Sequence, residues 1–278
     1  MNKRIENEIR KIYISVFNKV YKNVKKEKIL YSKNKQEKID DIILRLENSK
    51  KYKEFAEKFA KELSKRGLSQ QRGIWRKFYA AAKQKKHIVL PSTYKEFELL
   101  QFKKAVLHNL KMIKSIPDEV KEVYKFKYTK TLINSVVLGK VGRKTFEKEL
   151  LESGAKRAKL IARTETAKLQ TAILENRSSD LGSIAYIWKS SNDRRTRQSH
   201  KEMNNVVVFW RKNLEKPLLD GMYGNAGEFP NCRCTPLPIF DESDLSKNVY
   251  KLYDYRNHTI VSVTKFELLQ FMNNKQIF

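Results

Sequence analysis

Glycine and proline are scarce in this chain, and long apolar runs are missing. The 278 residues include nine glycines and six prolines, which favours long uninterrupted helices over many short strands. The longest apolar runs, such as Ile14–Phe17 and Val206–Trp210, fall far short of the roughly 20 residues that span a bilayer as a helix. The first residues also lack the apolar stretch of a signal peptide. These absences predict a soluble protein, made in the cytoplasm, with no membrane contact.

Recognisable catalytic motifs are missing as well. The sequence has no Gly-rich phosphate loop, no Gly-x-Ser-x-Gly nucleophile elbow and no His-x-x-x-His pair. The two cysteines, Cys232 and Cys234, lie so close in sequence that a disulfide between them would close a small, strained ring. In a cytoplasmic protein they are expected to stay reduced. We therefore expect a protein that is not an enzyme.

Positive charge is abundant and unevenly distributed. The chain has 59 Lys and Arg against 31 Asp and Glu, a formal net charge of +28. Residues 1–200 hold 49 basic and 22 acidic residues, whereas residues 201–278 hold 10 and 9. Such a surface attracts polyanions and binds phosphate backbones in a salt-dependent way. A lysine-rich codon bias is the alternative source, but it would raise glutamate too and leave the net charge nearer zero.

The basic residues are scattered, and no base-reading motif accompanies them. We therefore expect any contact with double-stranded DNA to be non-specific.

Apolar residues recur at helical spacing through the first 176 residues. Residues 1–29 are typical of an amphipathic helix, with apolar side chains at three- and four-residue steps: Ile5, Ile9, Ile12, Val16 and Val20. Further helices are expected over residues 39–46, 52–63, 75–79 and 93–137, the last interrupted near Pro117. The best-supported helix runs from Arg143 to Asn176, after a turn at Gly139 and Gly142.

The pattern changes after Arg177. Three segments rich in β-branched and aromatic residues predict strands: Ile184–Trp188, Asn205–Trp210 and Thr259–Val263. Residues 217–238 concentrate glycine and proline and predict a loop. We therefore predict an α+β fold, with a mostly helical N-terminal region followed by a small α/β module that has a short sheet. The predicted divisions are a basic helical region (1–135), the module (136–240) and a C-terminal extension with a short helix (241–278).

A first polar motif, Ile161-Ala-Arg-Thr-Glu165, lies on the best-supported helix. Arg163 and Glu165 diverge by about 200 degrees around a helix axis, so they cannot pair side by side and must serve different neighbours. Asp193 is an attractive partner for Arg163. We interpret Arg163, Thr164 and Glu165 as structural residues that join the helix to the module, rather than as catalytic residues.

A second motif, Asp193-Arg-Arg-Thr-Arg-Gln-Ser-His200, follows the predicted strand that ends at Trp188. Asp193 is expected to cap a helix start by accepting from the amides two and three residues on. That helical turn would place four side chains on one side: Asp193, Thr196, Arg197 and His200. Three arginines could hold a phosphate: Arg194, Arg195 and Arg197. The cluster equally suits a polar joint between elements.

A third motif, Pro230-Asn-Cys-Arg-Cys234, holds both cysteines. Side chains two apart in an extended segment point to the same face. With His200, Cys232 and Cys234 would offer three zinc ligands, with Asp193 or water as the fourth. The spacing departs from the usual Cys-x-x-Cys pattern. A structural loop that includes Asn231 and Arg233 is therefore favoured over a metal site, and no cofactor is expected.

Together with Trp188, these motifs resemble the phage Mu protein F-like family of minor head proteins. The resemblance covers about Val137 to Phe240 and rests on the order and spacing of the motifs. One departure is Asn205, which stands about where the family usually has glycine. Asparagine tolerates a left-handed backbone best among the other residues, so the fold is not put in doubt.

The resemblance implies a phage head morphogenesis protein, a minor capsid component used in virion assembly. It would associate with the portal protein and other head proteins and bind double-stranded DNA non-specifically. The expected location is the virion, inside the phage head, after synthesis in the host cytoplasm, with a prophage as one source. Some relatives carry toxin domains after the module, but the 38 residues beyond Phe240 are too few for an enzyme domain.

Two alternatives stay open from the residues alone. A phosphate-directed enzyme, such as a nuclease or toxin-like module, would use His200 as a base or metal ligand, with Asp193 and the arginines as charge stabilisers. A zinc-stabilised module would use His200, Cys232 and Cys234.

Overall fold

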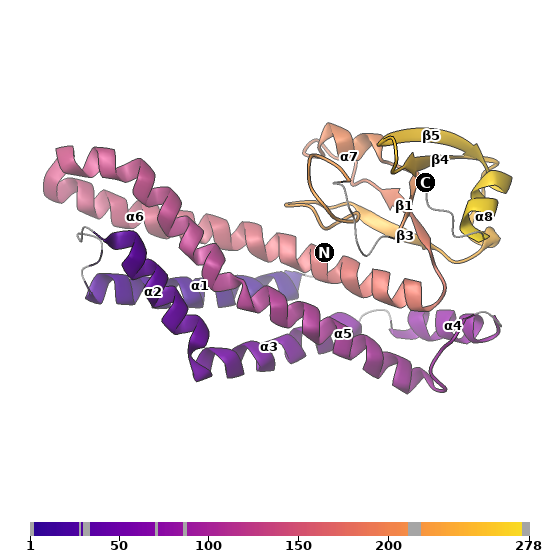
Figure 1. Ribbon diagram of the computed structural model, residues 1–278, viewed down its shortest axis with the longest axis horizontal. Helices are drawn as coiled ribbons and strands as arrows, with labels where there is room; N and C mark the ends of the chain where they lie inside the picture. The colour runs from indigo at the N-terminus through magenta and orange to yellow at the C-terminus, as the bar shows by residue number, and fades with distance from the viewer. Residues whose placement is uncertain are drawn as a thin grey trace. The chain divides into compact units, whose positions relative to one another are not determined.

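The computed structural model shows an α+β protein, as predicted (Figure 1). It describes residues 3–27, 29, 34–69, 72–85, 88–210 and 218–273, and only the backbone at residues 35 and 125–147. Six helices come first along these residues: α1 (Lys3–Lys26), α2 (Lys35–Asn48), α3 (Lys50–Ser69), α4 (Arg72–Lys83), α5 (Tyr94–Lys114) and α6 (Ile116–Asp180). Helix α1 confirms the amphipathic prediction, because all five of its predicted apolar positions are buried.

Helix α6 departs from the prediction at two glycines. The backbone is helical at both Gly139 and Gly142, so the predicted turn there is wrong. A glycine costs a helix interior only about 1 kcal/mol relative to alanine, which longer helical stretches on both sides can offset. The interruption near Pro117 is confirmed, since α5 ends at Lys114 and α6 begins at Ile116. Pro117 then occupies the first turn of α6, where no amide donor is required.

The C-terminal part forms a five-stranded mixed sheet. Its strands are β1 (Ala185–Lys189), β2 (Val206–Phe209), β3 (Thr235–Ile239), β4 (Val249–Asp254) and β5 (Thr259–Thr264). They lie in the order β3-β1-β2-β4-β5, with β2 and β4 parallel and the other pairs antiparallel. Three shorter helices follow within the described residues: α7 (Gln198–Glu202), the 3-10 turn η2 (Glu242–Asp244) and α8 (Lys265–Asn273).

Strands β1, β2 and β5 and helix α8 confirm their predictions, whereas β3 lies inside the predicted loop. The sequence of β3, Thr-Pro-Leu-Pro-Ile, holds two prolines, which usually mark a loop. Proline is tolerated in a strand at a sheet edge, where half of the amides need no partner. The edge position of β3 therefore explains how this strand can contain two prolines, which made its sequence resemble that of a loop.

Contacts group the described chain into two units that are not continuous in sequence. The first, the sheet unit, comprises residues 65–105 and 167–278; the second, the helical unit, comprises residues 2–64 and 106–166. This grouping puts α4 with the sheet, which the predicted divisions did not anticipate. In the helical unit, Tyr52 donates to the Ile113 carbonyl at 2.7 Å, and the rings of Phe17 and Tyr124 stack 5.3 Å apart.

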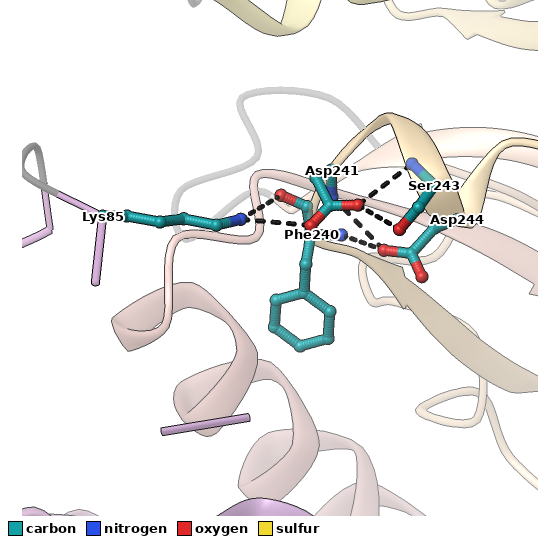
Figure 2. A network of polar contacts seen from close by, with 5 residues as sticks. All are labelled: Lys85, Phe240, Asp241, Ser243 and Asp244. Carbon is teal, nitrogen blue, oxygen red and sulfur yellow. Dashed lines mark hydrogen bonds and ion pairs between the residues drawn. The ribbon is translucent and has the colours of Figure 1, made fainter. Parts of the chain in front are cut away.

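Within the sheet unit, α4 is joined to the end of β3 by both stacking and charge. Phe78 stacks on Phe240 with ring centroids 4.7 Å apart. Just after α4, Lys85 donates at 3.3 Å to the Phe240 carbonyl and to the Asp241 carboxylate (Figure 2). Asp241 in turn caps η2 by accepting from the Ser243 amide at 3.0 Å. A hydrogen bond from the Ser243 hydroxyl is the largest of the effects that lower the pKa of Asp241, and the contact with Lys85 has a smaller effect in the same direction.

The core of the sheet unit surrounds β1 and β2. All four residues of β2 are buried, and Trp188 on β1 is fully buried. A strand buried on both faces reads as a continuous apolar run, which is why these strands were predictable. Among the described residues, no helix is both long and apolar enough to cross a membrane.

Candidate functional site around His200, Cys232 and Cys234

The turn that precedes α7 is organised by Asp193. Its carboxylate accepts from the Arg195 amide at 2.9 Å and from the Thr196 hydroxyl at 3.1 Å. The first of these is the predicted contact to the amide two residues on. However, residues 193–196 form a turn, and α7 begins only at Gln198 with Arg197 at its N-cap. The predicted helix start at Asp193 is therefore wrong, because the local hydrogen bonds of Asp193 complete a turn instead.

Residues 230–234 alternate their side chains between two neighbours. Cys232 and Cys234 both contact His200, whereas Arg233 between them reaches Asp193. Asn231, with a φ of 57°, takes the left-handed conformation that redirects the chain into this segment. Both cysteines therefore lie on the same face of the segment, as predicted.

His200 lies at the centre of the cluster. Its side chain is 3% exposed, and its Nδ1 atom is 3.4 Å from the sulfur of Cys232 and 3.4 Å from that of Cys234. The rings of Trp188 and Phe229 meet the imidazole edge-on, with centroids 5.5 and 5.1 Å away. These contacts fix the orientation of the imidazole ring.

The opposite edge of the imidazole faces an acid. His200 Nε2 lies 3.5 Å from Asp220 Oδ2. Asp220 and Gly221, with φ values of 52° and 68°, form the tight two-residue turn that Asp-Gly pairs favour. The turn is closed by a hydrogen bond from the Met222 amide to the Leu219 carbonyl at 2.8 Å, and the Leu218 amide donates to the Met222 carbonyl at 2.9 Å. Sequence reasoning missed Asp220, although the Asp-Gly pair signals a turn.

The two thiols are electrostatically unequal. A hydrogen bond from Cys232 lowers the pKa of Cys234 to about 4, against the effect of burial and with help from His200. The same hydrogen bond, together with burial, raises the pKa of Cys232 above its ordinary value. The hydrogen bond between the thiols therefore favours the proton on Cys232 and negative charge on Cys234.

Two further contacts join the α7 turn to residues 230–234. Arg233 donates to Asp193 Oδ1 at 2.7 Å and also pairs with Oδ2, and Arg197 donates to the Pro230 carbonyl at 3.0 Å. Burial raises the pKa of Asp193, but hydrogen bonds from the Arg195 amide, Arg233 and Thr196 outweigh it and hold that pKa below its ordinary 3.8. The side chain of Arg195 is exposed.

The remaining predicted residues belong to the helical unit. Arg163 lies 3.9 Å from Glu6 on α1, so its ion-pair partner is Glu6, and that of Asp193 is Arg233. Arg163 and Asp193 belong to different units, so the predicted pair between them stays a prediction. Thr164 is buried and Glu165 is half-buried. Sequence spacing gave no signal for Glu6, because the pair joins segments far apart in the chain.

A pocket of about 220 Å³ lies beside the cysteines. It is lined by the last part of α6, by Gly227 and by residues 232–236, and so includes Thr171 and both cysteines. Thr171 donates to the Ala226 carbonyl at 2.9 Å, which holds the loop against α6. The pocket is smaller than the roughly 300–1,000 Å³ typical of small-molecule sites.

Part of the chain that contains this site matches a known protein family. Residues 127–237 match the family described as Phage Mu protein F like protein. This segment is Mu F-like. The resemblance predicted from the motifs is therefore confirmed, and the Mu F-like segment contains β1, α7, β2 and the whole His200 cluster.

One curated relative is an uncharacterized protein of Haemophilus influenzae. It is 29% identical to this chain over 138 residues, which cover 49% of this chain and 29% of the relative. The chain therefore spans less than a third of the length of the relative it matches. No solved structure matches the chain.

Proposed function

We propose that this chain is a structural minor head protein of a phage. We also propose that it contacts DNA through the exposed face of α1. The Mu F-like segment supports the first half of the proposal. Its partners would be the portal protein and other head proteins, and its location the virion, after synthesis in the host cytoplasm. A prophage is a natural source for such a chain.

The DNA half of the proposal is supported by the charge on α1. Eight basic side chains of this helix are exposed: Lys3, Arg4, Arg10, Lys11, Lys19, Lys22, Lys25 and Lys26. The two acids of α1, Glu6 and Glu8, are half-buried, and Glu6 is paired with Arg163. The exposed face of α1 is therefore positive without interruption by an exposed acid.

The length of this face suits a duplex. At 1.5 Å per residue, Lys3 to Lys26 spans about 35 Å, which is about one helical turn of B-DNA. Lysines and arginines spread over that length can contact successive phosphates without reading bases, so the binding should be independent of sequence.

The His200 cluster favours a structural role over phosphate-directed catalysis. A general base must reach the proton that it removes, yet His200 is buried with Nδ1 against two sulfurs. Asp193 is engaged by both nitrogens of the Arg233 fork. The contacts of these two residues tie segments of the sheet unit together.

A salt titration tests the DNA contact. Binding of a labelled duplex of arbitrary sequence, followed by fluorescence anisotropy, should weaken linearly on a log-log plot as salt rises. Changing Arg10, Lys11, Lys19 and Lys22 to Gln should lower the slope by about 0.9 for each phosphate that these side chains neutralise in the wild type. No binding by the parent protein at low salt would remove the DNA half of the proposal.

Helix α3 provides a matched control. It carries exposed lysines interleaved with exposed Glu54 and Glu57, so its field is partly cancelled. Changing Lys51, Lys53, Lys58 and Lys61 to Gln removes the same charge and should alter the slope much less. Equal reductions of the slope in the two quadruple variants would show that net charge, rather than the α1 face, governs binding.

The head assignment has its own test. Mass spectrometry of purified particles from the phage or prophage that encodes the chain should detect it in the virion. Crosslinking in those particles should link it to the portal protein. Particles that form normally without the chain would contradict a role in head assembly.

A further inference from the structure

The hydrogen bonding of His200 leaves one feature unexplained. Its Nδ1 atom lies 3.4 Å from both cysteine sulfurs, and the ligand atoms of His200, Cys232 and Cys234 all lie within 4.8 Å of one another. A neutral imidazole nitrogen has either one hydrogen or one lone pair, so it cannot satisfy two equidistant sulfurs. A single cation between the three atoms would satisfy all of them.

The separations match a tetrahedral zinc site. With Zn–S bonds of about 2.3 Å and a Zn–N bond of about 2.05 Å, tetrahedral angles place nitrogen and sulfur about 3.5 Å apart. We propose that His200 Nδ1 and the sulfurs of Cys232 and Cys234 bind one zinc ion. This site is independent of the α1 face proposed to contact DNA.

The far side of the imidazole supports the same assignment. Metal bound at Nδ1 places the ring proton on Nε2, and this buried atom makes no hydrogen bond within the described residues. Asp220 Oδ2 is the acid that faces it, at 3.5 Å. A carboxylate facing the second ring nitrogen is the usual outer support of a zinc-bound histidine. Asp220 is therefore a positioning residue rather than a ligand.

The sulfur side is prepared for negative charge. The Cys234 amide donates to Cys232 Sγ at 3.4 Å. Backbone N–H groups that point at sulfur stabilise thiolates, the form in which cysteine binds metal. Binding of the ion would displace the thiol protons, as it does at any cysteine-ligated zinc site.

The described residues supply three ligands, which leaves the fourth tetrahedral position to water or an added ligand. The ion would join α7 to residues 230–234 in parallel with the Asp193–Arg233 and Arg197–Pro230 contacts. Trp188 and Phe229 would cover the histidine. The expected role is stabilisation of the sheet unit.

Metal analysis of the full chain tests the proposal. Protein purified under reducing conditions and dialysed against dilute zinc should hold one zinc per chain, with a dissociation constant well below about 1 μM, as expected of structural zinc sites. Cobalt in place of zinc should give intense d–d bands typical of tetrahedral geometry and a charge-transfer band typical of thiolate ligands. Zinc should also slow the reaction of both thiols with a disulfide reagent and raise the melting temperature.

Variants locate the ion. Cys232→Ser, Cys234→Ser and His200→Gln should each lose high-affinity zinc, and the serine variants should lose cobalt–thiolate absorption. If these fail to fold, Asp220→Asn provides a milder test, with zinc affinity expected to fall about 10–100-fold. His258→Gln removes a histidine outside the cluster and should leave zinc binding unchanged.

Three results would overturn the proposal. The reduced wild-type chain could bind less than about 0.1 zinc per chain, far below the stoichiometry of a structural site. The thiols could react equally fast with and without zinc, which would indicate a thiol-lined loop. Asp220→Asn and the three ligand variants could bind zinc as tightly as the wild type, which would place the metal elsewhere.

Discussion

Arg233 projects away from its two cysteine neighbours and holds Asp193 with both arms of its guanidinium. The pair lies across the same two segments that His200 and the cysteines join. One face of residues 232–234 is thus apolar and thiol-rich, and the other is ionic. Alternation of side chains along an extended segment produces this division.

Replacing Asp193 by Asn should lower the melting temperature at neutral pH but not in acid. Asn keeps an oxygen to accept from the Arg195 amide, so the change isolates the charge. The pKa of Asp193 is held below its ordinary 3.8, so its contribution is complete above that value and is lost as the pH falls through the lower folded pKa. Melting curves at several pH values for both proteins measure the difference.

Arg233→Gln provides the partner arm of a double-mutant cycle. The two single variants and the double variant should have similar melting temperatures, because each removes the same interaction. A difference between wild type and Asp193→Asn that persists unchanged in strong acid would show that the ion pair is not its source.

Asn205 should tolerate glycine better than alanine. Its φ is 65°, and its amide donates to the Trp188 carbonyl at 2.8 Å, which glycine retains. Alanine in a left-handed conformation costs about 1–2 kcal/mol. Asn205→Gly should therefore match the wild type in urea unfolding, and Asn205→Ala should lose about that amount.

The opposite response is expected at Asn18, an exposed position within α1. Alanine there should stabilise the protein by about 0.5 kcal/mol, because it has the higher helix propensity. If both Asn→Ala changes altered the free energy of unfolding in the same direction, the backbone conformation at Asn205 would not be the reason for its sensitivity.

The sequence predicted elements well where one physical signal dominated. Helix α1 has a regular apolar stripe, and β2 is a continuous run of valines and phenylalanine, so period and composition were sufficient. Strand β3 was missed because its prolines are acceptable only at a sheet edge, and edge position is a property of the tertiary fold.

The candidate site divides in the same way. Cys232 and Cys234 point the same way because side chains alternate along an extended segment. Asp193 accepts from the amide of Arg195, which is only two residues away in sequence. Partners distant in sequence were not predictable: Glu6 for Arg163 and Asp220 for His200. Long-range pairing depends on how elements pack, which spacing along one segment does not encode.

Arg177 should contribute through packing as well as hydrogen bonding. It is 1% exposed, donates to the Leu68 carbonyl near the end of α3 at 2.9 Å, and lies over the Trp75 ring at 5.1 Å. Burial lowers its pKa, and removal of the donor would leave a buried carbonyl unpaired. Arg177→Ala should cost about 2–4 kcal/mol in urea unfolding.

Arg177→Met separates the two contributions. Methionine fills much of the space but cannot donate, so its destabilisation should lie between zero and that of alanine. Equal destabilisation by methionine and alanine would indicate that the hydrogen bond alone is responsible.

Gly227 should be far less replaceable than Gly221, although both have positive φ values. A Cβ at Gly227, where φ is 95°, would meet Thr171 Oγ1 at 2.6 Å and the Cys234 carbonyl at 3.1 Å, whereas one at Gly221, where φ is 68°, meets nothing within 4 Å. Gly221→Ala should therefore cost only the strain of the backbone, about 1–2 kcal/mol. Gly227→Ala adds steric overlap that separates the loop from α6, so it should cost more in urea unfolding. It should also make Cys232 more accessible to thiol reagents, because Gly227 and Cys232 line the same pocket and displacement of the loop would open it. Equal costs for the two substitutions, with unchanged thiol reactivity, would show that the loop yields freely and does not depend on its close approach to Thr171.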